Sequence, residues 1–548
     1  PTKMPQHSLY RKRIEIIYAL LKLESLSAIC QKFSGIYTGK EFFDRLWDCV
    51  FLISGHAEDN AIDKEIIYLL NRVNQGLYEI EEETLRLKRE FAKAVNGSDN
   101  DYIVFNLNGV RQNKNVEVHI TSSNGVHDFI IKDSKGKELE YQVVRVYKND
   151  KPYKSFNYSA VDVLVNIELP CMGYEKLSVE FNNEKDLQLD FPLSMVLGSA
   201  CGEKVEDFVE IDNGLFKVKL TNNGIESITN NEGKKYVGDV GSIYFERTEG
   251  AEAWWSNMPT VESICQENFE CRILAKGELL NKFEIKGKVG KHDVRQVISI
   301  EKNKPSIDFY TEINCKDDCG RFWAKFGCDK QTDLNVSIPY GEEKRDLSVE
   351  SYDYEDAEQN IRGLFYYCDY IKAKNDGNDF AILNNNLCNA AKLDDNGISL
   401  FLRRMFSQSY QNDSGEVAWF NQCDKFNKAT GVMDFEFSLC PFNKQKNLSQ
   451  KAKENLIKTD SVKKYENGGK LSAKGSLFDI KNNNVAISSF RKVDKGYELR
   501  VFETDGKEEE LRIVDAFNKR QVVDLIGNKL TEGVNKISPY QIKTILYK

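Results

Sequence analysis

The stretch Asp212-Asn213-Gly214-Leu215-Phe216-Lys217-Val218-Lys219-Leu220 decides the fold class of this chain. Its second half alternates apolar side chains with lysines, and this period of two is typical of a strand that buries one face. Its first half contains an Asn-Gly pair, which favours a tight turn because both residues tolerate positive φ. The same combination recurs from about residue 97 to the C-terminus, as at 116–120 and 161–165. We therefore predict stacked antiparallel sheets over most of the chain.

Residues from about 8 to 95 follow a different period. Apolar residues recur there three or four positions apart in three segments, which is the spacing of one face of a helix. Gly35 and Gly39 separate the first segment from the second, and residues 55–60 separate the second from the third. Short breaks between helices place neighbouring helices antiparallel, so the sequence predicts a three-helix bundle.

A chain of 548 residues is too long for a single hydrophobic core. We expect a multidomain α+β protein in which a three-helix bundle precedes antiparallel β-sandwich domains. The predicted divisions are a helical bundle at 1–96, a small β-sandwich at 97–204, a large β-supersandwich at 205–445 and a C-terminal β module at 446–548. The lysine-rich stretch 444–464 marks the last division.

Composition excludes several classes of partner. The formal net charge is −9, and the lysines are interleaved with acidic residues, which argues against a nucleic-acid-binding surface. No run approaches the ~20 apolar residues of a membrane span, and the N-terminal residues lack the apolar core of a signal peptide. The 13 cysteines are scattered, mostly within apolar runs, as expected of buried reduced thiols. We expect a cytoplasmic protein that binds neither nucleic acid nor membrane and that can form a homo-oligomer.

His56 is the histidine whose position suggests chemistry. It lies at the break between the second and third predicted helices, and Glu58 and Asp59 follow it closely. In one interpretation Asp59 or Asn60 caps the third helix and His56 covers the junction. In the other, a histidine on such a break is a metal ligand that points toward a neighbouring domain. Spacing alone leaves both interpretations open.

Several short phrases follow the helical segment in a fixed order. They are Val104-Phe105-Asn106, the segment from Asp133 to Gln142, the segment from Pro170 to Tyr174, the segment from Asn213 to Val218, Pro339-Tyr340-Gly341 and Leu402-Arg403-Arg404. Together with Trp47 and His56 in the helical segment, this order resembles the rear part of glycoside hydrolase family 38, the α-mannosidases. The resemblance covers roughly residues 20–445.

The resemblance implies a fold and an activity. It implies a galactose-mutarotase-like supersandwich and the retaining hydrolysis of an α-mannoside or other glycan, with zinc as the cofactor. It implies that His56 is a metal ligand and that Tyr340, Arg403 and Arg404 bind substrate. The nucleophile, the acid/base and the other zinc ligands would lie outside residues 1–548, in a missing catalytic domain or subunit, so we expect no catalytic residue in this chain. In the family an aspartate usually follows the histidine, whereas Ala57 stands here.

Two other functions stay open. The chain can be a non-catalytic carbohydrate-binding or assembly protein on the same scaffold, which the alanine at position 57 favours. It can also be an enzyme that uses the sandwich groove by itself, although the sandwich contains few histidines. Trp254-Trp255 can be a stacking platform for a sugar or part of the core. An apolar patch on the helical bundle near His56 would indicate that a catalytic domain docks there.

Overall fold

The structure is a computed structural model. It describes residues 4–54, 63–122, 124–148, 158–189, 202–236, 238–248, 260–316, 318–328, 332–345, 364–374, 379–385, 390–394, 397–405, 430–442 and 447–548. Helices come first and antiparallel sheets follow, which confirms the predicted multidomain α+β class with β-sandwich domains. None of the helices in these ranges is long and apolar enough to cross a membrane.

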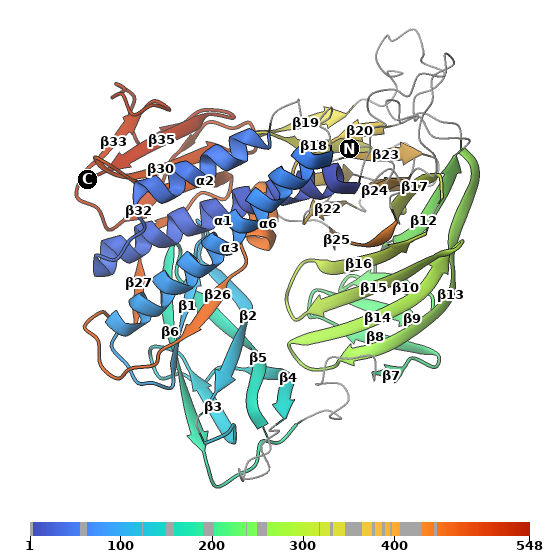
Figure 1. Ribbon diagram of the computed structural model, residues 1–548, viewed down its shortest axis with the longest axis horizontal. Helices are drawn as coiled ribbons and strands as arrows, with labels where there is room; N and C mark the ends of the chain where they lie inside the picture. The colour runs from blue at the N-terminus through green and yellow to red at the C-terminus, as the bar shows by residue number, and fades with distance from the viewer. Residues whose placement is uncertain are drawn as a thin grey trace.

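Three helices occupy the N-terminal part: α1 (Met4–Ser34), α2 (Lys40–Leu52) and α3 (Asp63–Ala94). Gly35 has a φ of 78° and follows the end of α1, which places the predicted helix break correctly. The helices bury apolar residues such as Ile16, Leu46 and Val73 in one core. Figure 1 shows them lying across the molecule, between the C-terminal sheet and the small sandwich.

The small sandwich has two antiparallel sheets with apolar side chains such as Val104, Val118 and Val163 between them. Its strands from this part of the chain are β1 (Asp101–Asn106), β2 (Gln112–Thr121), β3 (Asp128–Lys132), β4 (Tyr141–Lys148), β5 (Tyr158–Leu169) and β6 (Gly173–Asn182). One sheet has the order β2-β5-β4, and the other contains β1, β3 and β6.

The large sandwich stands on the other side of the molecule and has its own core (Figure 1). A small sheet of order β11-β10-β9-β8 packs against a long curved sheet. The small sheet contains β8 (Phe208–Asp212), β9 (Phe216–Thr221), β10 (Gly224–Asn230) and β11 (Lys235–Tyr236). The long sheet contains β7 (Glu203–Lys204), β12 (Val240–Thr248), β13 (Thr260–Ala275), β14 (Leu280–Val289), β15 (His292–Glu301), β16 (Ile307–Cys315), β17 (Gly320–Phe326), β18 (Asp333–Ile338), β19 (Gly341–Arg345), β20 (Leu364–Tyr366), β21 (Tyr370–Lys374), β22 (Phe380–Asn384), β23 (Ala390–Asp394), β24 (Gly397–Met405) and β25 (Gly431–Cys440).

The C-terminal segment contributes strands to a sheet formed by earlier parts of the chain. The lysine-rich stretch that marked the predicted division forms a helix and a strand, α6 (Leu448–Leu456) and β26 (Asp460–Lys463). β26 pairs with β1, and β27 (Lys474–Ser476) pairs with β6, so both strands belong to the small sandwich. The remaining strands are β28 (Phe478–Ile480), β29 (Val485–Val493), β30 (Gly496–Glu503), β31 (Glu509–Glu510), β32 (Ile513–Asp515), β33 (Arg520–Val523), β34 (Lys536–Ile537) and β35 (Ile542–Tyr547). The sheet β29-β30-β35-β33 shares its apolar core with the helices.

Candidate functional site

The loop that carries His56 joins the end of α2 to the start of α3. His56 itself and the Trp254-Trp255 pair lie outside the described residues. The helix ends on both sides of the loop are described, and Trp47, one turn before the end of α2, donates its indole N–H to Glu24 of α1 at 3.0 Å. Burial raises the pKa of the Glu24 carboxyl, and this hydrogen bond opposes the rise.

Large apolar side chains are exposed on both sides of this loop. At the end of α2, Phe51 is 68% and Leu52 is 52% exposed, and near the start of α3, Ile67 is 39% and Tyr68 is 54% exposed. The neighbouring residues Cys49 and Val50 point into the core, so the exposed side chains belong to the outer face of these helices. We call these four residues the apolar rim. Solvent-exposed apolar groups in one place are typical of a surface that another polypeptide covers.

Tyr340 lies on the surface and Arg403 lies in the interior. Tyr340 stands in the tight turn between β18 and β19, is 42% exposed, and meets Phe502 edge to face at 5.3 Å. Arg403 on β24 is 1% exposed and pairs in register with Phe322. Arg404 pairs in register with Arg321, while its side chain lies outside the described part of the structure. Among the described contacts, none joins Tyr340 to Arg403.

A buried charged cluster lies on β12, β17 and β23, close to β24, and no sequence pattern predicted it. Glu246 of β12 accepts a hydrogen bond from the indole of Trp323 at 2.8 Å and pairs with Arg321 at 3.3 Å, both on β17. Lys392 of β23 also pairs with Glu246 and lies over the Trp323 ring at 4.8 Å. Burial lowers the pKa of Arg321, and the Glu246 carboxylate opposes this. The cluster fixes β12, β17 and β23 around the strand that carries Arg403 and Arg404.

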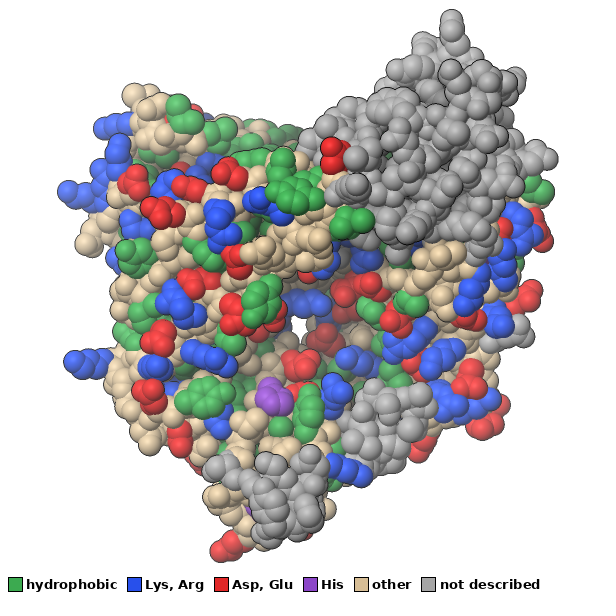
Figure 2. Space-filling model, in the orientation of Figure 1, with side chains coloured by type: hydrophobic (Ala, Val, Ile, Leu, Met, Phe, Trp, Pro, Cys, Tyr) green, Lys and Arg blue, Asp and Glu red, His purple; other side chains and the backbone are tan. Residues whose placement is uncertain are grey.

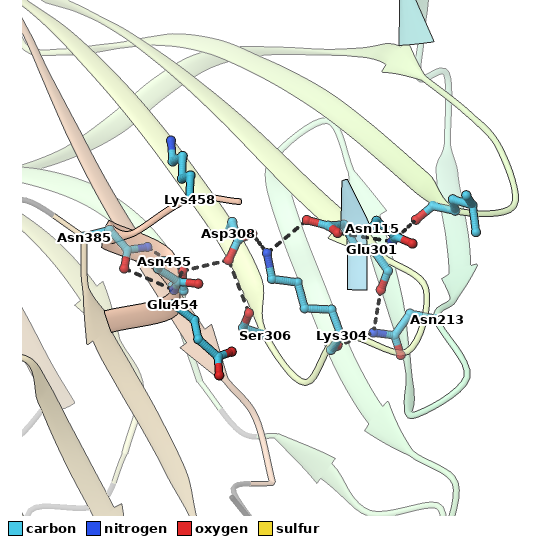
Figure 3. Close-up of polar contacts among 12 residues, drawn as sticks. Asn115, Asn213, Glu301, Lys304, Ser306, Asp308, Asn385, Glu454, Asn455 and Lys458 are labelled. Carbon is cyan, nitrogen blue, oxygen red and sulfur yellow. Dashed lines mark hydrogen bonds and ion pairs between the residues drawn. The ribbon is translucent and has the colours of Figure 1, made fainter. Parts of the chain in front are cut away.

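A second set of polar contacts connects the small sandwich to the large one (Figure 3). Asn115 of β2 donates to Glu301 of β15 at 3.2 Å. Lys304, in the turn after β15, contacts Glu301 at 2.9 Å and Asp308 at 2.5 Å. Burial by itself lowers the pKa of Lys304, but the carboxylates of Asp308 and Glu301 raise it well above its usual range. We call this chain of contacts the polar seam.

The polar seam continues to the C-terminal segment. Ser438 of β25 donates to Asp308 at 2.7 Å, and Asn385 donates to Ser438 at 2.7 Å. Asn455 of α6 in turn donates to Asn385 at 3.2 Å. In Figure 2 the molecule is open through its centre, and charged side chains of both signs surround the opening. Partly buried polar groups that are hydrogen-bonded in this way help to fix the relative orientation of the units they join.

Two of the sequence phrases have structural roles at the same junction. Gln142 is 5% exposed and accepts from the N–H groups of Leu279 and Leu280 at 3.0 and 2.8 Å. Its amide also donates to the carbonyl of Leu280 at 2.9 Å. Asn213 donates to the carbonyl of Lys304 at 2.9 Å and so holds the turn after β15. Gln142 therefore joins the two sandwiches, and Asn213 orders a turn of the large one.

The described residues contain no group of three or more histidine, cysteine or acidic side chains that could hold a metal ion. His56 falls outside that search and would supply one ligand, whereas zinc needs three or four. The part of the chain that the structure describes therefore offers no candidate zinc site.

Part of the large sandwich matches a known protein family. Residues 211–409 match the model of the glycosyl hydrolases family 38 C-terminal domain. No curated protein matches the chain in sequence. An α-mannosidase from Enterococcus faecalis V583 is similar in structure, with a TM-score of 0.78 and 15% identity over 100% of this chain and 68% of that chain. A glycosyl hydrolase family 38 protein from Enterococcus faecalis superposes with a TM-score of 0.76 and 15% identity over 100% of this chain and 71% of that one. Residues 211–409 therefore form a domain of the glycosyl hydrolase family 38 C-terminal type, and the chain as a whole shares the fold of these two proteins.

Proposed function

We propose that this chain is the C-terminal portion of an α-mannosidase-like retaining glycoside hydrolase. It supplies walls of the sugar site and one zinc ligand, His56, while the reacting carboxylates belong to a catalytic domain outside residues 1–548. The observation that carries the proposal is the family 38 match over residues 211–409, a range that includes the turn with Tyr340 and the strand β24 with Arg403 and Arg404. All of this chain superposes on 68% of the Enterococcus α-mannosidase, which leaves 100 − 68 = 32% of that chain without a counterpart here.

The apolar rim supports the idea that a catalytic domain docks beside the His56 loop. Phe51 and Leu52 precede the loop and Ile67 and Tyr68 follow it, all exposed. Leaving such side chains in water costs about 1.5–3 kcal/mol each relative to full burial, so covering them favours association. When bound, zinc would polarise the substrate and help to orient it. This chain's own contribution is to present the imidazole and to hold the sandwich walls in place through the polar seam.

The test is the hydrolysis of an aryl α-mannoside by the 548-residue chain, alone and mixed with a separately expressed family 38 catalytic domain. We expect no turnover by the chain alone and zinc-dependent turnover by the mixture. A His56→Ala variant should lower the activity of the mixture and its affinity for zinc, while an Ala57→Asp variant should keep or raise both. Turnover by the isolated chain contradicts the proposal.

The second candidate is a non-catalytic carbohydrate-binding or assembly protein, which Ala57 beside His56 favours. In that case the chain would bind glycans, and no catalytic domain would gain activity from it. Measuring complex formation and turnover in the same mixture separates the two functions.

A further inference from the structure

Two turns with the same sequence pattern meet between the large sandwich and the C-terminal sheet. Pro339-Tyr340 forms the centre of the turn between β18 and β19, and Pro539-Tyr540 forms the centre of the turn before β35. The first turn is closed by the pairing of Ile338 with Gly341. In the second, the N–H of Gln541 donates to the carbonyl of Ser538 at 3.0 Å. Each tyrosine is thus the third residue of a proline-led turn.

Both tyrosines have a backbone conformation that favours glycine. The φ of Tyr340 is 61° and that of Tyr540 is 53°. Positive φ at the third position of such a turn is usually met by Gly or Asn, and a bulky residue there is strained. Strain of this kind collects at binding sites, where the surrounding structure enforces it. The rings are nevertheless 42% and 46% exposed, so burial in the core does not account for them.

The two turns form one surface. A Cβ added to Gly341, next to Tyr340, would lie 3.7 Å from Cδ1 of Tyr540. A Cβ added to Gly506 would lie 2.9 Å from the same ring, so the Tyr540 ring rests on the backbone of both neighbouring turns. Tyr340 packs edge to face on Phe502, which directly precedes Glu503. We call Tyr340 and Tyr540 the tyrosine platform.

Glu503 is a buried carboxylate that hydrogen-bonds to the backbone of the Tyr540 turn. This residue is 0% exposed, and its Oε2 accepts from the N–H groups of Tyr540 at 3.0 Å and Gly506 at 2.7 Å. Its Oε1 accepts from the N–H of Asp505 and the amide of Asn484, both at 2.8 Å. A buried carboxylate with four donors holds the backbone of the Tyr540 turn in place before any ligand arrives, which reduces the entropy cost of binding.

The surroundings of the platform are acidic. Burial raises the pKa of the Tyr540 hydroxyl, and the carboxylates of Glu342, Glu503 and Asp505 raise it further. Glu503 is buried and its oxygens are occupied, but the Asp505 side chain is 34% exposed and its carboxylate can accept hydrogen bonds from ligand hydroxyl groups. The acidic surroundings repel phosphates and other anions. Exposed aromatic rings offer a flat apolar face to the C–H groups of a ligand. A neutral sugar ring has hydroxyl groups at its edge and C–H groups on its faces, so it matches both features of this surface.

We infer that the tyrosine platform is a subsite for one neutral hexose unit of a glycan, with Tyr540 contributed by the C-terminal sheet. The sugar class rests on the proposed function. The inference adds a binding role for the last hundred residues, which the match over residues 211–409 does not include.

The test is calorimetric titration of the 548-residue chain with an α-linked mannotriose. Tyr540→Gly removes the ring and relaxes the positive φ, so the variant should unfold at the same or a higher temperature than the native chain. We expect its affinity for the trisaccharide to fall about tenfold, whereas Tyr540→Phe should stay within about twofold. The matched control is Tyr465→Ala, since Tyr465 is 63% exposed and lies between β26 and β27, away from the platform.

Three results would overturn the inference. They are the absence of trisaccharide binding by the native chain, an unchanged affinity in a folded Tyr540→Gly variant, and an equal loss in Tyr465→Ala. A further arm uses tetramethylammonium, because two tyrosines beside carboxylates can also enclose a cation. Binding of this cation without binding of the trisaccharide assigns the platform to another ligand and also overturns the inference.

Failure of the subsite and failure of the proposed function are distinguishable. The titration needs no catalytic domain, so binding that depends on Tyr540 supports the subsite even when a mixture with the catalytic domain is inactive. An active mixture together with unchanged binding in Tyr540→Gly supports the proposed function and rejects the subsite.

Discussion

Gln142 of the small sandwich hydrogen-bonds to both backbone groups of Leu280 in the large sandwich. It accepts from the N–H at 2.8 Å and donates to the carbonyl at 2.9 Å. A side-chain amide carries a donor and an acceptor on neighbouring atoms, so it can bond to both backbone groups without carrying a charge. The backbone of Gly277 also packs against the Gln142 side chain, because a Cβ there would lie 2.2 Å from its Cδ.

Replacing this amide should loosen the junction between the sandwiches. Gln142→Leu removes the side-chain partner of the N–H groups of Leu279 and Leu280 and of the Leu280 carbonyl at the start of β14, so we expect a loss of about 1–3 kcal/mol in the free energy of unfolding. Urea denaturation measures it. The control is Gln188→Leu, at an exposed glutamine whose contact is to Asp186 in its own loop, and it should change stability by less than ~0.5 kcal/mol. Equal effects of the two variants would refute this role.

Replacing Lys304 should lower the free energy of unfolding more than replacing Lys302. Lys304→Met leaves Glu301 and Asp308 facing each other without a cation at a partly buried site, and we expect a cost of about 2 kcal/mol. Lys302→Met removes a pair with Glu140 in which the two side chains are 36% and 47% exposed, and its cost should stay below ~1 kcal/mol. Chemical denaturation of both variants at one salt concentration provides the comparison.

His292 should make stability depend on pH. The residue is 0% exposed, its Nδ1 accepts from the N–H of Lys316 at 3.0 Å, and burial lowers its pKa to about 4. An unfolded histidine has a pKa of about 6.5, so the unfolded chain binds a proton that the folded chain does not. The stabilisation is therefore complete above pH ~6.5 and falls by roughly 3 kcal/mol as the pH approaches ~4. Unfolding free energies of the native chain and of His292→Gln, measured across this window, should converge toward low pH; parallel curves would contradict the assignment.

The apolar rim predicts where a catalytic domain binds. Phe51→Asp places a charge at the most exposed residue of the rim and should weaken association with a family 38 catalytic domain at least tenfold, since a buried unpaired charge is costly. Val514→Asp is the matched control, because Val514 is 62% exposed on the C-terminal segment. Analytical ultracentrifugation of the mixtures reads out both variants. Equal binding by the two would place the docking surface elsewhere.

Local patterns in the sequence predicted the local structure well. The alternation at 216–220 is strand β9, and the break between Gly35 and Gly39 falls between α1 and α2. These features depend on neighbouring residues, which a sequence shows directly. The helix α6 was not predicted, because its nine residues are mostly polar and lie in a stretch that the sequence marked as a connector.

The long-range features could not be predicted in the same way. Glu246, Arg321 and Lys392 belong to three strands far apart in sequence, and no spacing rule connects them. Gln142 and Asn213 belong to motifs that the sequence showed. Their roles could not be predicted, because their hydrogen-bond partners are backbone groups far away in the sequence. The roles of His56, Arg403 and Arg404 stay predictions, and the domain divisions do as well.

Because β26 and β27 complete a sheet of the small sandwich, this sheet can finish folding only late in synthesis on the ribosome. β1 and β6 are made more than 270 residues before the strands that complete their sheet, since β6 ends at Asn182 and β26 begins at Asp460. Until those late strands emerge, the side of β1 that will pair with β26 has no hydrogen-bonded neighbour, and an unpaired strand edge is prone to pair with other chains.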